Sequence, residues 1–191
     1  MKSLFFHHAG CAVVGEYSRL DRLAPTALPG LARLVFALTL FAFFWKSALT
    51  KFGDGLSGLF IPSVGAYAQI LPRTFEQVGY DPSAMGVIAW VIVMAGTWAE
   101  VILPLLIVAG LLTRPAALSM IGFIIVMSVV DVLGHGVPMG SLLDGDPKSL
   151  VPDQRIFWIF PLLVMVFMGA GPLSLDRLIG QKLAILKQEE I

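Results

Sequence analysis

Long apolar stretches alternate with more polar segments along this chain. Four of them approach the length of about 20 apolar residues that a helix needs to cross the hydrocarbon core of a bilayer, which is about 30 Å thick. They lie at about residues 30–50, 86–112, 116–133 and 156–173. The pattern therefore predicts an all-α membrane protein, built as a bundle of four transmembrane helices.

The connections between these stretches differ in length. Only Thr113 and Arg114 separate the second stretch from the third, so we expect these two helices to form an antiparallel hairpin around that turn. The first connection is a long outer loop with Gly and Pro residues around an apolar centre. We expect a short interfacial helix in it, near 64–71.

The same pattern divides the chain into three parts. Residues 1–27 carry an apolar run that two histidines interrupt, followed by several charges. A secretory signal needs a longer uninterrupted run, so we expect this segment to be retained, lying at the membrane surface or disordered. Residues 28–176 form the predicted membrane domain, and 177–191 form a cytoplasmic tail.

Lysine and arginine residues orient the predicted bundle, because they gather on the cytoplasmic side of membrane proteins. If both termini are cytoplasmic, eight of these residues lie inside and five lie outside. We therefore expect a multi-pass protein of the cell's inner membrane with cytoplasmic N- and C-termini.

Composition agrees with a lipid environment. Of the 191 residues, 57% are hydrophobic and 14% are charged, whereas soluble domains carry about 25% charged residues. The basic and acidic residues balance at 13 each, so no attraction to nucleic acid is expected. Cys11 is the single cysteine, which excludes an intramolecular disulfide and dithiol exchange within this chain.

Charged residues inside the apolar stretches are the candidate functional groups, because each costs about 2.5–3.5 kcal/mol on membrane-insertion scales. Helix rise places Lys46 in the outer half of the first span and Glu100 about halfway along the second. We expect these two to pair, with Asp131 near Lys51, around a polar cavity open to the outside. The candidate substrate or quinone pocket then comprises Lys46, Lys51, Trp98, Glu100, Asp131 and His135.

A purely structural role for these groups stays open at this stage. The two lysines can extend to the outer interface, and Asp131 and His135 can be helix-end groups in contact with water. Even a Glu100 that finds a partner can serve only to hold helices together.

Motifs for bound cofactors are missing from the sequence. His7, His8 and His135 lack the neighbouring Cys, His or Glu residues of a metal site, and haem needs histidines from facing helices. No glycine-rich nucleotide or phosphate loop occurs. No haem, flavin or metal site is therefore expected, and a quinone remains the candidate cofactor. This favours a subunit over a complete enzyme, and whether the chain is itself an enzyme stays open.

Three segments resemble the DoxX family of small integral membrane proteins. They are FFWKSALTKF (43–52), AEVILPLLIVAGLLTRPAAL (99–118) and GAGPLSLDRLIG (169–180). Family members typically have lysine near the end of the first helix, an acidic residue in the second, a Gly-Leu-x-Thr-Arg turn and an alanine pair. The corresponding residues here are Lys46 and Lys51, Glu100, Gly110 to Arg114, and Ala116 with Ala117. The resemblance covers about 31–180 and implies a four-helix membrane fold.

The resemblance also implies a redox setting. Related DoxD-type proteins are linked to thiosulfate:quinone oxidoreductase, and other members to membrane complexes that handle redox stress, thiols or metals. Three classes stay open: a membrane subunit of a quinone-linked oxidoreductase assembly, a non-catalytic anchor or assembly factor that docks a soluble partner, and a transporter of small solutes or metals. Besides the lipid bilayer, we expect other protein subunits to bind through the outer loops, and a homo-oligomer is compatible with the sequence.

Overall fold

The computed structural model describes residues 3–145 and 147–189, with side chains from Leu20 to Gln188 apart from residue 146. Within that part of the chain, every named element is a helix, so the all-α prediction is confirmed. The expectations for His7, His8 and Cys11 concern side chains outside the described residues.

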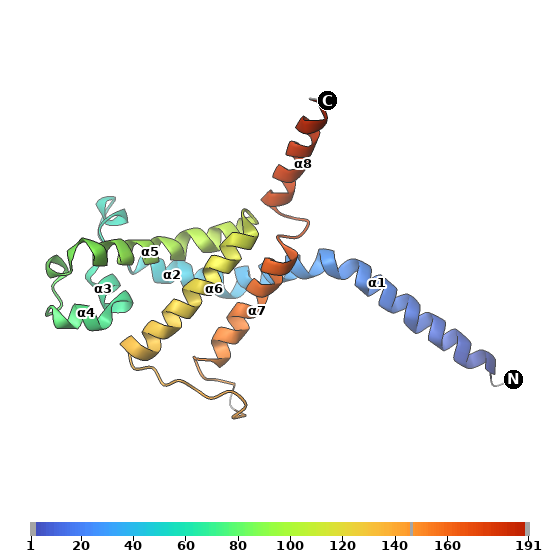
Figure 1. Ribbon diagram of the computed structural model, residues 1–191, viewed down its shortest axis with the longest axis horizontal. Coiled ribbons are helices and arrows are strands. Elements are labelled where there is room, and N and C mark those ends of the chain that lie inside the picture. Colours follow the sequence, from blue (N-terminus) through green and yellow to red (C-terminus); the bar gives the residue numbers. More distant parts are fainter. Residues whose placement is uncertain (1–2, 146, 190–191) are drawn as a thin grey trace.

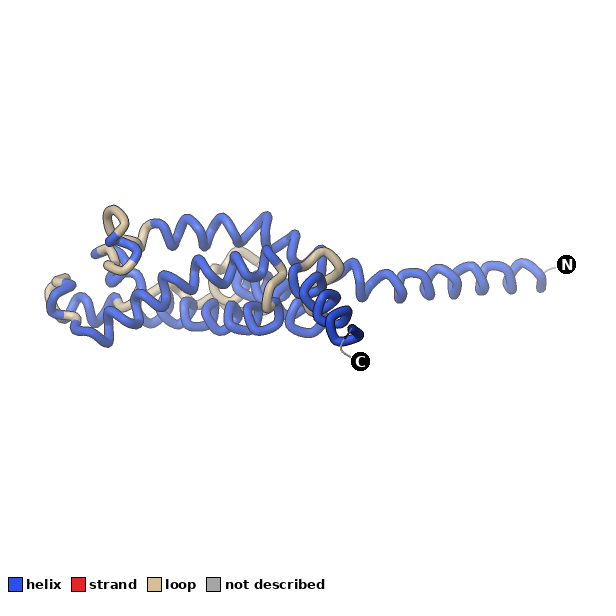
Figure 2. The backbone as a smooth tube through the Cα atoms, turned by 90° about the horizontal axis from the view of Figure 1, so that it is seen from above, coloured by secondary structure: helices blue, strands red, loops and turns tan. Residues whose placement is uncertain are grey.

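One continuous helix opens the structure. α1 (Ser3–Phe36), the π-helical turn η1 (Ala37–Phe41) and α2 (Ala42–Leu49) follow one another without a break. Its part Leu20–Leu49 is long and apolar enough to cross a membrane, and it includes residues 30–49 of the first predicted span. The backbone is already helical from Ser3. Figure 2 shows the N-terminal half of α1 continuing beyond the packed helices.

The predicted hairpin is present, with a shifted turn. α5 (Gly86–Ala109) and α6 (Thr113–Val129), which the π-helical turn η4 (Val130–Gly134) extends, are the second and third candidate membrane spans. Gly110 ends α5 in the left-handed conformation, at φ 68°, the usual device for stopping a helix. Thr113 and Arg114, predicted as the turn, are instead the first residues of α6, and the turn consists of 110–112.

The fourth predicted span corresponds to α7 (Asp153–Met168), which is shorter than expected. Its 16 residues extend about 24 Å, and Gly169 at φ 83° ends it, so 169–173 form a turn. The described residues therefore contain three candidate membrane spans, and a fourth is not shown among them. α7 lies beside α6 and also packs against α1 (Figure 1).

The cytoplasmic tail predicted for 177–191 is helical in its described part, as α8 (Leu175–Glu189). Its apolar side chains recur three and four residues apart and are exposed: Leu175, Leu178, Ile179, Leu183 and Leu186. A helix with one apolar and one charged face is typical of a membrane surface. α1 and α8 project from the same end of the bundle (Figure 1).

The long loop between α2 and α5 contains two short helices and two 3₁₀ turns, η2 (Ser57–Leu59) and η3 (Pro82–Ala84). The helix expected near 64–71 is α3 (Val64–Ile70), and α4 (Pro72–Gln77) follows it. Ser63 Oγ accepts a hydrogen bond from the Ala66 amide at 3.2 Å and so caps α3. Both helices pack against the first half of α5, at the end of the bundle remote from α8 (Figure 1).

A cluster of buried apolar side chains forms the core between the long helices. It joins α1, α2, α5, α6 and α7 through Phe36, Phe44, Ile107, Met120, Ile124, Leu162 and Met165, all fully buried. Ala116 and Ala117 are also buried in it, and such small side chains let helices approach closely within a membrane. The alanine pair after the hairpin turn therefore has a packing role.

Candidate functional site

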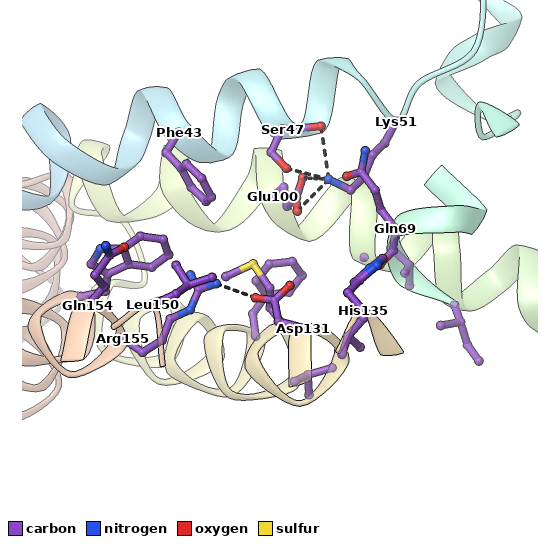
Figure 3. A pocket seen from close by; sticks show the side chains of 18 residues that line it. Phe43, Ser47, Lys51, Gln69, Glu100, Asp131, His135, Leu150, Gln154 and Arg155 are labelled. Atoms are coloured by element: carbon purple, nitrogen blue, oxygen red, sulfur yellow. Dashed lines mark hydrogen bonds and ion pairs between the residues drawn. The ribbon is translucent and has the colours of Figure 1, made fainter. Parts of the chain in front are cut away.

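A cavity of about 650 Å³ lies between α2, α3, α5, α6 and α7 (Figure 3). Its walls are mostly apolar, and three aromatic side chains, Phe43, Phe123 and Trp158, contribute to them. The polar and charged side chains that line it are Ser47, Lys51, Gln69, Glu100, Asp131, His135, Gln154 and Arg155. Two ion pairs lie on facing sides of this cavity.

The first ion pair joins Lys51 and Glu100. Lys51 Nζ lies 3.1 Å from Oε1 and 2.9 Å from Oε2 of Glu100, and each side chain is only 4% exposed. Ser47 adds its hydroxyl oxygen at 2.6 Å and its carbonyl oxygen at 3.3 Å as acceptors for the same ammonium group. Glu100 lies about 15 Å along α5 from Gly110, which places this pair near the middle of the second candidate span.

The expected pairing of Glu100 with Lys46 is wrong. Phe44 and Ala48 are fully buried, so they mark the face of α2 that contacts the core. Lys46 is two residues from either of them, which turns it by about 200° to the opposite, exposed face. Lys51 follows the end of α2, where the chain leaves the helix, and its side chain is thereby free to turn back toward α5.

The second ion pair joins Arg155 and Asp131. Arg155 Nη2 donates to Asp131 Oδ2 at 2.7 Å, and the two side chains are 7% and 22% exposed. The guanidinium carbon also lies 4.2 Å from the centre of the Trp158 ring, close enough for a cation–π interaction. Asp131 thus lines the same cavity as Lys51 but is paired with a different cation.

Arg155 was not among the predicted site residues, because the sequence suggested only an outer-loop charge. A signal was present, however. Arg155 and Trp158 are three residues apart and therefore neighbours on one helix face. The third and fourth apolar stretches are also joined by a single connection, so Asp131 and Arg155 belong to adjoining helix ends.

Of the two remaining candidates, His135 lines the cavity and Trp98 lies outside it. The Nε2 of His135 lies 3.0 Å from the carbonyl oxygen of Gln69, so this side chain links the end of α6 to α3. The indole Nε1 of Trp98 donates to the carbonyl oxygen of Leu59 at 3.1 Å, and its ring packs edge-on against Phe52.

A second polar network closes the opposite end of the bundle. Asp176 accepts hydrogen bonds from the amides of Leu112 at 2.7 Å and Thr113 at 2.9 Å, the first amides of α6. Burial acts to raise the pKa of Asp176, but these hydrogen bonds, together with the charge of Arg33, outweigh it and hold the pKa below its ordinary value. The two segments 110–114 and 171–176, far apart in sequence, are therefore in direct contact.

Arg33 joins the first helix to the same network. Its Nη1 donates to the carbonyl oxygens of Ala170 at 2.7 Å and Leu173 at 2.6 Å, and its Nη2 donates to that of Val108 at 3.2 Å. These contacts fix the bundle at this end but are remote from the cavity.

Metal ligands do not converge in the described part of the chain, where no group of three or more His, Cys, Asp or Glu side chains is arranged to hold an ion.

Comparison with protein-family models matches residues 29–134 to DoxX. No curated protein and no solved structure matches the chain. The matched region is more than half of the sequence. It contains the first candidate membrane span from Pro29 onward and the whole of the second and third, together with Lys51, Glu100 and Asp131. Arg155 and Asp176 lie beyond it. The chain therefore belongs to the DoxX family.

Proposed function

We propose that this protein is the membrane subunit of a quinone-linked oxidoreductase assembly, and that its cavity binds the quinone headgroup. The observation that carries the proposal is the cavity itself, which has aromatic and aliphatic walls, with a buried ion pair on one side and a partly buried ion pair on the facing side. Its volume of about 650 Å³ falls within the range of about 300–1,000 Å³ for small-molecule sites.

The chemistry of the lining fits a molecule that is apolar and polar in different parts. A quinone presents a flat conjugated ring, which stacks favourably on aromatic side chains, and oxygens that accept hydrogen bonds. It also dissolves in the bilayer, so it reaches a cavity between membrane helices without crossing water. These properties match Phe43, Phe123 and Trp158 beside the charged groups.

We also propose that α7 completes the bundle as a fourth membrane helix, with both chain termini on the cytoplasmic side. Leu162 and Met165 of α7 are fully buried in the core, and α1 and α8 project from one end (Figure 1). A helix of about 24 Å is accommodated by local thinning of the bilayer. Labelling a Gln188→Cys variant, in a Cys11→Ser background, with a membrane-impermeant maleimide tests this. Labelling from the cytoplasmic side alone is expected, and labelling from the outside alone would contradict it.

Quinone binding is tested by fluorescence of the protein in lipid nanodiscs. A variant with Trp45, Trp90 and Trp98 replaced by Phe keeps Trp158 as its single tryptophan, at the cavity wall. A matched variant keeps only Trp98, which lies outside the cavity. Titration with a short-tailed ubiquinone should quench Trp158 with saturation, while Trp98 shows only the linear quenching of quinone dissolved in lipid.

Equal and non-saturating quenching in the two variants would refute the proposal. Gentle solubilisation of native membranes then identifies the assembly. A haem, flavin or copper protein that copurifies and reduces quinone supports the oxidoreductase role. A soluble partner without redox activity favours the anchor or assembly-factor class.

A further inference from the structure

Arg155 has hydrogen-bonding capacity that the described chain does not use. Its Nη2 is bonded to Asp131, whereas its Nε and Nη1 are buried without an acceptor in the described residues. A buried donor left unpaired costs about 1–3 kcal/mol, and native proteins seldom leave one. Three other side chains, Arg33, Thr113 and Asp153, also have an unpaired buried atom. Among these four, Arg155 is the one that lines the cavity.

Lys51, the other cation of the cavity, has no donor to spare. An ammonium group has three hydrogens, and Lys51 Nζ already has four acceptor oxygens within 3.3 Å, two from Glu100 and two from Ser47. A ligand would have to break the buried ion pair to bind Lys51. The Nε and Nη1 of Arg155 have no acceptor among the described residues, so a ligand oxygen that reaches them breaks no existing hydrogen bond.

The charge balance of the cavity limits what the ligand can be. Lys51 is matched by Glu100 and Arg155 by Asp131, so the four charges sum to zero. A bound anion would add a charge without a counterion in a site of low polarity, which is strongly unfavourable. An uncharged oxygen acceptor accepts the same hydrogen bonds without that penalty.

We propose that Arg155 anchors the ligand by donating hydrogen bonds from Nε and Nη1 to an uncharged oxygen, and that the site takes neutral carbonyl compounds with an apolar body and rejects anions. This inference rests on the proposed function, because it assigns one carbonyl of the quinone to Arg155. Trp158 lies 4.2 Å from the guanidinium and Asp131 accepts from Nη2, so these two contacts hold the side chain at the cavity wall. Nε and Nη1 are buried beneath neighbouring side chains, which must move aside for a ligand oxygen to reach them.

Two measurements on the full chain in nanodiscs test the anchor. In the Trp158-only protein, Arg155→Lys keeps a charge for Asp131 but lacks the guanidinium donors. We expect it to weaken binding of the short-tailed ubiquinone by about 10- to 100-fold, the usual effect of one lost hydrogen bond to a charged group. Arg73→Lys is the matched control, an exposed arginine outside the cavity, and should bind like the parent protein.

Infrared spectroscopy of ¹³C-carbonyl-labelled quinone bound to the parent protein gives a readout that needs no variant: one carbonyl band should lie at lower frequency than in lipid alone. In the Arg155→Lys variant, that shift should be absent. Decanoate, an anion with an apolar tail, should fail to displace the quinone, whereas decylubiquinone should displace it.

The outcomes separate the two proposals. If the parent protein shows saturable quenching but unshifted carbonyl bands, or Arg155→Lys binds as tightly as the parent, the anchoring role is refuted while the quinone site stands. Displacement by decanoate at concentrations that leave the bilayer intact refutes the exclusion of anions. Absence of saturable quenching in the parent protein refutes the quinone site itself.

Discussion

The contribution of the Lys51–Glu100 ion pair to the stability of the fold can be tested quantitatively. Removing one partner leaves a buried charge without its counterion, which costs roughly 3–5 kcal/mol in pairs of this kind. Coulomb's law gives a similar figure: two unit charges at the observed 2.9 Å interact by about 5–6 kcal/mol at an effective dielectric constant of about 20. We therefore expect Glu100→Gln and Lys51→Met each to lower the free energy of unfolding by about 3–5 kcal/mol.

The double variant distinguishes a pair from two independent residues. With both charges gone, neither partner is left uncompensated, so Lys51→Met/Glu100→Gln should lose no more stability than either single variant, which corresponds to a coupling energy of about 3–5 kcal/mol. The assay is unfolding of the purified protein by titration with sodium dodecyl sulfate, followed by circular dichroism. Lys46→Met is the matched control, since that exposed lysine should change stability by less than about 0.5 kcal/mol.

Two results would refute this reasoning. If Lys51→Met and Lys46→Met are equally mild, the ammonium of Lys51 is not effectively buried. If the losses of the two single variants simply add in the double variant, Lys51 and Glu100 do not interact.

Further predictions concern the end of the bundle that Asp176 closes. Because the folded-state pKa of Asp176 is lowered, its stabilising contribution is present above the pKa of the unfolded chain and is lost as pH falls through the folded pKa. Thermal unfolding midpoints should therefore fall in acid more steeply for the parent than for Asp176→Asn, and parallel pH profiles would contradict this. Gly110→Ala should destabilise the protein by about 1–3 kcal/mol, because a Cβ there would lie 2.7 Å from that of Ser174 at a left-handed φ of 68°. Gly122→Ala, in open space on α6, should be neutral or stabilising by up to about 1 kcal/mol in the same detergent titration, and equal losses for both glycines would count against the strain argument.

The helices were predictable because apolar stretches of membrane length leave few alternatives. The end of α7 was not, because the apolar pattern continues through 169–173 while Gly169, at φ 83°, already turns the chain. Similarly, Thr113 and Arg114 were placed in the turn, although the left-handed Gly110 ends α5 earlier.

Depth along the helices predicted that charged groups from different spans would meet, and Lys51, Glu100, Asp131 and His135 do line one cavity. Which groups pair could not be derived from depth. Lys51 lies just beyond the end of α2, where helical periodicity no longer gives a side chain's direction. The pairing of Asp131 with Arg155 depends on how a long, irregular loop returns the chain to the bundle.

The contacts of Arg33 also have a consequence for biogenesis. Arg33 lies in the first helix, but its acceptors Ala170 and Leu173 lie 137 and 140 residues later in the sequence and are therefore synthesised long after it. Until they emerge, two of the three carbonyl partners of Arg33 are missing, and the first amides of α6 lack Asp176. The segment 170–176 thus completes hydrogen bonds of two helices that precede it in the chain. A translation product that stops before residue 170 therefore keeps all three candidate spans but lacks these hydrogen bonds, so its helices should be less firmly packed at this end of the bundle.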